Sequence, residues 1–238
     1  LQTVLGYDSL QTGITILPLS IGLFVFALLG ASLTTRYSPR RIVEIGLLAM
    51  LVGEVLLIAF TGPNLRSVGF AVALALVGAG LGLLASQLGN IIMSSVAPER
   101  GSEAGGLQGT AQNLGASLGT ALVGSILIAS LVGNFQTAVL ADPALADVSS
   151  QIAAAAEQNA NFVSTAQVQA AAEQAGLSAA QVDTLVTTYA DTQIVALKAS
   201  FAAIALFALL ALWFVRRLPV LAVSDPATND LSSATMSG

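Results

Sequence analysis

The sequence predicts an all-α integral membrane protein, a bundle of five transmembrane helices. The chain of 238 residues is 55% apolar and 9% charged, with a mean hydropathy of +0.83, whereas a soluble domain carries about 25% charged residues. Its apolar residues also gather in long runs, and about 20 such residues span a hydrocarbon core of about 30 Å as a helix. The five runs occupy residues 14–33, 42–60, 68–96, 104–132 and 194–215, and the last transmembrane helix is expected over residues 194–217.

The spans are expected to be helices because backbone polar groups in lipid must be hydrogen-bonded within a helix or a closed barrel. A barrel requires apolar and polar residues to alternate along each strand. That alternation is absent from the five runs.

Basic residues predict how the spans are oriented. If the loop between the first two spans is cytoplasmic, alternation places six of the eight basic residues on that side, as the positive-inside rule requires. These six are Arg36, Arg40, Arg41, Arg100, Arg216 and Arg217. We expect a multi-pass protein of the plasma (inner) membrane with Leu1 outside and a disordered cytoplasmic tail over residues 218–238. The chain begins without an initiator Met or a signal-peptide pattern, which predicts that further spans precede it.

The segment from residue 133 to residue 193 differs in chemistry from the spans. It is rich in Ala and Gln and contains six acidic residues and no Lys or Arg. Ser178 and Gln181 fit a capping box, and Gly176 could end the preceding helix. We therefore expect an extracytoplasmic loop with short helices, in which the last helix could begin near Ala179. An alternative is that the loop collects cations or covers an outer vestibule.

Residue types that carry enzymatic chemistry are scarce. Cysteine and histidine are absent, which removes thiolate nucleophiles, the usual zinc ligands and histidine acid–base pairs. A loose G-x-G-x-x-A pattern begins at Gly80, but it lies inside an uncharged span and not at a strand-to-helix turn. We expect no enzymatic activity, no cofactor, no metal and no nucleic-acid partner.

Small residues at four-residue spacing predict close packing of the third and fourth spans. Glycines on one helix face allow two helix backbones to approach closely in a membrane. The spaced glycines are Gly78, Gly82, Gly105, Gly109, Gly115 and Gly119.

Four amides lie within the same two spans: Gln87, Asn90, Gln112 and Asn113. Amides in lipid are tolerated where they bond another helix or face a wet cavity. The sequence leaves both interpretations open, one as links between helices and the other as the wall of a substrate path.

The two acids of the second span have different expected roles. Glu44 lies three and four residues from Arg41 and Arg40, so it can pair with them at the membrane interface. Glu54 lies about 18 Å from the cytoplasmic end of the same helix, by the rise per residue. An ionised carboxylate at that depth in the membrane is energetically costly. Glu54 is therefore the candidate proton-coupling residue, unless Arg66 neutralises it.

Three stretches resemble drug:proton antiporters of the major facilitator superfamily, of the fourteen-span EmrB/QacA type. LQTVLGYDSLQTG at residues 1–13, followed by Leu17-Pro18, is similar to the entry into their C-terminal half. Residues 30–41 resemble the second copy of the superfamily's signature cytoplasmic loop, with Gly30, Arg36, Arg40 and Arg41 at matching positions. VAPERG at 96–101 and GGLQGTAQNLG at 105–115 resemble the stretch that joins the next two spans.

The resemblance implies a function, with two departures from the signature. Thr35 and Ser38 replace the acid and the second glycine of that loop, so a charge-pair gating role is not expected here. The implied protein exports small, amphipathic compounds by proton antiport with alternating access. Its partners would be the lipid bilayer, the substrate, protons and the missing N-terminal half. The alternative is a non-transporting membrane subunit that packs against a partner through Gly/Ala helix faces.

Overall fold

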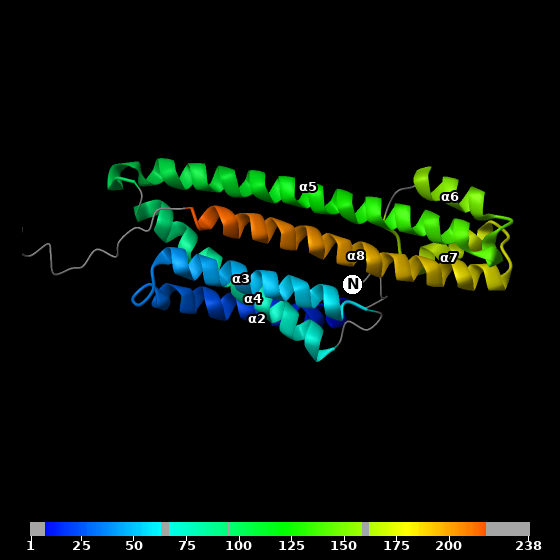
Figure 1. Ribbon diagram of the computed structural model, residues 1–238, viewed down its shortest axis with the longest axis horizontal. Coiled ribbons are helices and arrows are strands. Elements are labelled where there is room, and N and C mark those ends of the chain that lie inside the picture. Colours follow the sequence, from blue (N-terminus) through cyan, green and yellow to red (C-terminus); the bar gives the residue numbers. More distant parts are fainter. Residues whose placement is uncertain (1–7, 63–66, 95, 159–161, 218–238) are drawn as a thin grey trace, which may run out of the picture.

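Five long helices form the framework of the protein in the computed structural model, which describes residues 8–62, 67–94, 96–158 and 162–217. They are α2 (Ser9–Leu33), α3 (Pro39–Phe60), α4 (Val68–Ser94), α5 (Gly101–Ala141) and α8 (Ala179–Val215). Successive long helices run in opposite directions (Figure 1). All five are long and apolar enough to cross a membrane, and the described residues contain no strand. The predicted all-α membrane bundle is therefore confirmed.

Local sequence signals set several helix ends. Asp8 and Gln11 form a capping box at the start of α2, and Ser178 and Gln181 form the predicted one at the start of α8. Gly176 has a φ of 75°, which a residue without Cβ adopts readily. It ends the preceding helix in a Schellman motif, because its N–H donates to the Glu173 carbonyl and the next N–H donates to the Ala172 carbonyl.

Helix α4 is the centre of the first part of the bundle, packed between α2 and α3. A Cβ at Gly78 would lie against the Leu19 carbonyl of α2, and one at Gly82 against the Leu23 carbonyl. On another face, Gly80 lies against the Gly46 carbonyl of α3. These contacts support the predicted role of glycines in this span, because the absence of side chains lets three helix backbones meet.

Helices α5 and α8 form a second, longer pair. At about 1.5 Å per residue, their 41 and 37 residues extend to roughly 60 Å and 55 Å, about twice the thickness of a hydrocarbon core. Their far ends project beyond the bundle of α2, α3 and α4 (Figure 1). The 3₁₀ turn η2 (Pro143–Leu145) and the short helices α6 (Ser149–Gln158) and α7 (Thr165–Gln174) complete this end.

We call residues 131–193 the distal domain. It has its own apolar core, which includes Leu131, Phe135, Val139, Leu145 and Leu185. The short helices were expected here, but the fourth helix does not end near residue 132. It continues to Ala141, because the buried side chains recur every four residues and extend one helix face. The last helix begins at Ala179, where the Ser178 capping box predicted it, and the tail over residues 218–238 lies outside the described residues.

Candidate functional site

Glu54 is the only buried charged residue of the part of the chain that the structure describes. It lies in the second half of α3, a helix that packs against both α4 and α8, and it is 3% exposed. Its Oε2 atom has no hydrogen-bond partner among the described residues. Buried polar atoms normally have partners, and an isolated ionised carboxylate is costly within a membrane. Arg66, the expected neutralising residue, lies outside the described residues.

Gln87 lies at an interhelical contact. Its side chain is fully buried, and Nε2 donates to the Gly30 carbonyl of α2 at 2.9 Å and to Ser86 Oγ at 3.0 Å. A Cβ at Gly30 would lie against Ser86 Oγ. Gly30, singled out as part of the signature loop, therefore allows α4 to approach α2. Gln87 acts here as a link between helices, one of its two predicted roles.

Gln112 and Asn113 lie elsewhere, on an exposed face of α5. Gln87 is buried between α2 and α4, so the structure does not bring these three amides together within this chain. The Asn90 side chain lies outside the described part of the structure. A substrate path formed by the four amides stays a prediction that would need surfaces beyond the described residues.

The glycines of α5 also face outward. Among the described residues, a Cβ at Gly109, Gly115 or Gly119 would meet nothing within 4 Å. The buried residues of α5 are Leu131, Phe135 and Val139, all in its distal part, and most of its membrane-spanning part is exposed. Within the described chain α5 contacts mainly α8 and α6, so the expected tight packing of the fourth span stays a prediction. A packing role for Gly105, Gly109, Gly115 and Gly119 stays a prediction.

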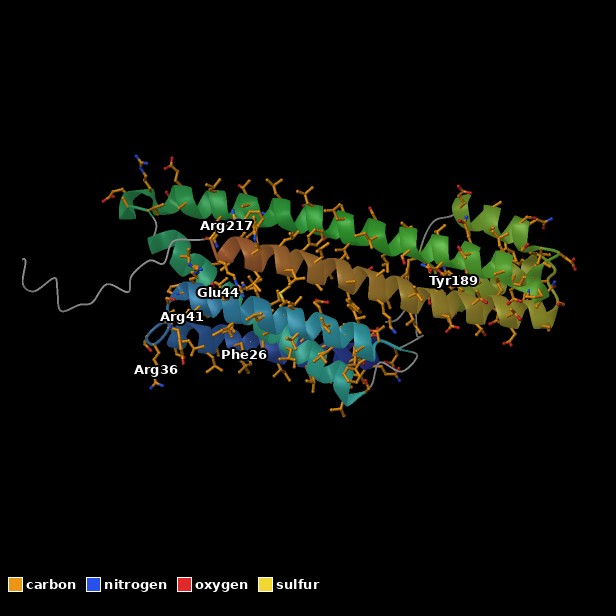
Figure 2. All side chains as sticks on the ribbon, in the orientation of Figure 1. Phe26, Arg36, Arg41, Glu44, Tyr189 and Arg217 are labelled. Carbon is orange, nitrogen blue, oxygen red and sulfur yellow. The ribbon has the colours of Figure 1, made fainter. Side chains whose placement is uncertain are left out.

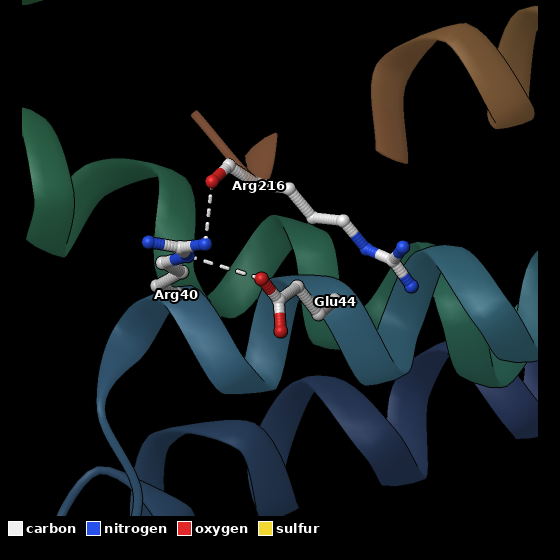
Figure 3. A network of polar contacts seen from close by, with 3 residues as sticks. All are labelled: Arg40, Glu44 and Arg216. Carbon is white, nitrogen blue, oxygen red and sulfur yellow. Dashed lines mark hydrogen bonds and ion pairs between the residues drawn. The ribbon is translucent and has the colours of Figure 1, made fainter. Parts of the chain in front are cut away.

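We call residues 34–41 the arginine loop; its Arg40, in the first turn of α3, contacts the end of α8. The predicted pair of Arg40 and Glu44 is present, with Nε and Oε1 3.0 Å apart. Arg40 Nη2 also donates to the main-chain carbonyl of Arg216 at 2.6 Å (Figure 3). A cation at a helix C-terminus interacts favourably with the helix dipole. Arg40 therefore fastens the end of α8, a role that sequence spacing did not reveal because the two residues lie 176 positions apart.

One end of the protein carries a group of charged side chains, most of them arginines (Figure 2). Arg36, Arg41, Glu44 and Arg217 lie at one end, while Tyr189 lies in the opposite half (Figure 2). Arg36 and Arg41 are exposed there. Tyr189, which is buried in the distal core, carries no motif in the sequence that marks it. Its only signal was the helical spacing of apolar residues before residue 194.

These features define the class of protein: an integral membrane protein built from an antiparallel bundle of apolar helices, with one buried carboxylate among its described residues. The sequence profile of the Major Facilitator Superfamily matches residues 1–146, more than half of the chain. The chain belongs to the Major Facilitator Superfamily.

Three curated relatives carry names that refer to drug resistance. The tetracenomycin C resistance and export protein of Streptomyces glaucescens is 34% identical over 165 residues, 67% of this chain and 29% of the relative. The multidrug resistance protein Stp of Mycobacterium tuberculosis is 30% identical over 136 residues, 57% and 25% of the two chains. The puromycin resistance protein pur8 of Streptomyces alboniger is 31% identical over 129 residues, 53% and 26% of the two chains.

The similarity covers only part of each relative. Across these three proteins the aligned region spans between 25% and 29% of the relative's length. The profile match ends at residue 146, so α6, α7 and α8 lie beyond it. No solved structure matches the chain.

Proposed function

We propose that this chain is part of a multidrug efflux transporter that exports small, amphipathic compounds by proton antiport with alternating access. Membership of the Major Facilitator Superfamily and relatives named for resistance and export support transport. The observation that carries the coupling mechanism is Glu54, a buried carboxylate with an unpartnered oxygen. A carboxylate in such a place is a default candidate for proton transfer within a membrane.

Proton exchange at Glu54 would couple to movement of the helices around it. The charged form is disfavoured in a dry, packed site and favoured when the site opens to water. A conformational change that wets and dries Glu54 alternately would thus load and release a proton. The cycle needs no other ionisable group from the described part of this chain.

The exposed faces of α2 and α5 are the surfaces through which the chain would meet the rest of the transporter. Most side chains of both helices are not buried within this chain. Substrate sites in transporters lie near the midplane between two halves. Gln112 and Asn113, polar and exposed on α5, would then line the substrate path. The arginine loop would face the cytoplasm and the distal domain would face outward.

The complete protein with Glu54→Gln tests the proposal. Glutamine keeps the shape of the side chain but cannot exchange a proton, so accumulation driven by a pH gradient in inverted vesicles should fall at least about tenfold, a ~1.4 kcal/mol effect. Substrate exchange at equal pH, which moves no net protons, should persist. Glu103→Gln, an exposed acid at the start of α5, is the control and should leave both unchanged. Gradient-driven transport by Glu54→Gln at the wild-type rate would refute the coupling role.

A non-transporting subunit is the second candidate, because the Gly/Ala face of α5 has no partner within the described residues. This chain contributes no cysteine of its own, so in a transporter whose other cysteines are replaced one introduced thiol reports on one position. In the complete transporter, maleimide labelling of Gln112→Cys should change with substrate, whereas Gln87→Cys, buried between α2 and α4, should stay protected. Protection of Gln112→Cys under all conditions would favour the packing subunit.

A further inference from the structure

The distal domain has an open cavity of about 540 Å³, and several residues on its wall, among them Gln151 and Ala171, are exposed to solvent. Helices α5, α6, α7 and α8 all contribute to its wall. The volume falls within the range of about 300–1,000 Å³ that is usual for small-molecule sites. All lining side chains are apolar except those of Gln151, Gln167 and Tyr189. The cavity therefore suits a ligand with a large apolar body.

Alanine side chains on α6 and α7 keep this space open. Ala155, Ala156, Ala171 and Ala172 all lie on the cavity wall. Helix axes pack about 8–10 Å apart, and protein interiors normally fill to a density of about 0.74. Methyl groups are too short to fill the space between these helices and the larger residues of α5 and α8. The cavity is thus a consequence of the sequence in this segment.

Tyr189 forms a fixed part of the wall. Its ring lies edge-to-face against Phe135, with centroids 5.3 Å apart. Its hydroxyl accepts a hydrogen bond from the Val163 N–H at 3.1 Å and lies 3.2 Å from the Val163 carbonyl, to which Gln193 Nε2 also donates at 2.9 Å. Because this hydroxyl is hydrogen-bonded to the main chain, it is not available to a ligand. What the two residues present to a ligand is therefore the aromatic rings of Phe135 and Tyr189. Aromatic rings attract organic cations.

The charge of the surrounding segment selects the sign of the ligand. Residues 133–193 carry six carboxylates and no Lys or Arg, which creates a potential that attracts cations and repels anions. None of the carboxylates lines the cavity among the described residues. A compact ammonium group would enter without a counter-ion, at a high desolvation cost. A delocalised cation shielded by apolar groups avoids most of that cost.

A second hollow of about 810 Å³ follows α5 toward this cavity. It is a shallow, open groove on α5 from Thr120 to Gln136, lined mostly by small residues together with Ile128, and it reaches Glu157 of α6. Val132 lines both hollows. From Thr120 to Gln136 the groove follows about 24 Å of helix by the rise per residue. It therefore adjoins the cavity on one side and the membrane-spanning part of α5 on the other.

We propose that the distal cavity binds lipophilic organic cations, as a site separate from the membrane-spanning part of the transporter. The site adds a binding step to the proposed export function. Only the claim that the bound cation is being exported rests on that proposed function. The groove along α5 is the route by which such a cation would reach the cavity. Binding itself requires no transport.

Binding to the 238-residue chain in lipid nanodiscs tests the proposal. The probes are radiolabelled tetraphenylphosphonium and tetraphenylborate, which share size and shape but differ in the sign of their charge, with empty nanodiscs subtracted. Tetraphenylphosphonium should bind saturably, and Ala171→Phe should weaken it at least about tenfold by filling the cavity. Ala170→Phe, exposed on the same helix but not on the cavity wall, should bind as the wild type does.

A thiol-protection measurement decides the matter if Ala171→Phe fails to fold. Tetraphenylphosphonium should protect Gln151→Cys, on the cavity wall, from maleimide and leave Ser150→Cys reactive. Wild-type binding by Ala171→Phe, equal losses in both Phe variants, equal net retention of tetraphenylborate, or equal protection of both thiols would overturn the proposal. These outcomes do not involve Glu54. A transporter can therefore export without the distal site, or bind there while Glu54→Gln abolishes coupling.

Discussion

Small residues have opposite consequences in the membrane bundle and in the distal domain. Around α4, glycines lie where neighbouring backbones meet, and any side chain at Gly78 or Gly82 would collide with α2. In the distal domain, alanines lie where four helices surround a space of about 540 Å³. Smallness alone therefore does not predict packing. What decides the outcome is whether a second backbone approaches the small residue.

Helix α5 shows the same point within one element. Its glycines have the spacing of those on α4, but Gly109, Gly115 and Gly119 meet nothing within 4 Å among the described residues. The pattern predicts a surface that two helices can share. Whether the surface is used depends on which helix lies beside it.

Gly78→Ala should lower the free energy of unfolding more than any of the other proposed substitutions. If it did not, the contrast between close packing around α4 and open space in the distal domain would not hold. The added methyl group meets the Leu19 carbonyl, which belongs to the backbone and cannot rotate away. Overpacking of a core costs about 1–3 kcal/mol, and we expect at least the upper end of that range. Unfolding of the chain in mixed micelles with increasing denaturing detergent measures it.

Gly119→Ala is the matched control, because its methyl group meets open space in the described chain. In the isolated chain it should change the free energy of unfolding by no more than about 0.5 kcal/mol, as is usual for surface substitutions. In the complete transporter the same substitution should reduce stability if α5 packs there against another helix. A loss as large as that of Gly78→Ala in the isolated chain would show that the two glycine patterns do not differ.

The sequence predicted the features that depend on composition and on neighbouring residues. The five apolar helices follow from hydropathy, and Gly176 and the Ser178 capping box follow from local backbone chemistry. The extension of α5 to Ala141 was missed because hydropathy reports where a segment leaves lipid, not where its helix ends. A helix can continue beyond the membrane when one of its faces stays buried. In α5 that face carries Phe135, which lies in the distal core.

The candidate site was less predictable, because it depends on contacts between distant segments. Local spacing predicted the pair of Arg40 and Glu44, four residues apart. The same pattern could not reveal that Gln87 would reach the Gly30 carbonyl, 57 positions away, or that α5 would carry Gln112 on a different surface. Amides look alike in sequence whether they join helices or face a cavity.

Tyr189→Phe should have an intermediate effect, confined to the distal domain. The substitution keeps the ring contact with Phe135 but removes the partner of the Val163 N–H. Leaving such a group unsatisfied costs about 1–3 kcal/mol. Hydrogen exchange at the Val163 amide should accelerate roughly tenfold for each ~1.4 kcal/mol, while exchange in α4 should not change. Tyr37→Phe, on an exposed residue, is the control. Unchanged exchange at Val163 would mean that the hydroxyl does not fix the cavity wall.

Arg40→Gln should have the smallest effect, at the opposite end of the protein. It removes the pair with Glu44 and the bond to the Arg216 carbonyl. Both side chains of the pair are about a quarter exposed, so solvent and salt weaken their attraction and the loss should be about 1 kcal/mol or less. The chain's single tryptophan, Trp213, reports on this end, because the Arg217 guanidinium lies 3.9 Å from its ring centroid.

The fluorescence of Trp213 should therefore shift in Arg40→Gln, and high salt should produce part of the same shift in the wild type. Arg41→Gln, which removes an exposed arginine one position along α3, is the matched control and should leave the emission unchanged. Equal shifts in the two variants would assign the effect to net charge. A shift confined to Arg40→Gln would mean that a single side chain holds the end of α8, whereas α4 is held along its length by contact between backbones.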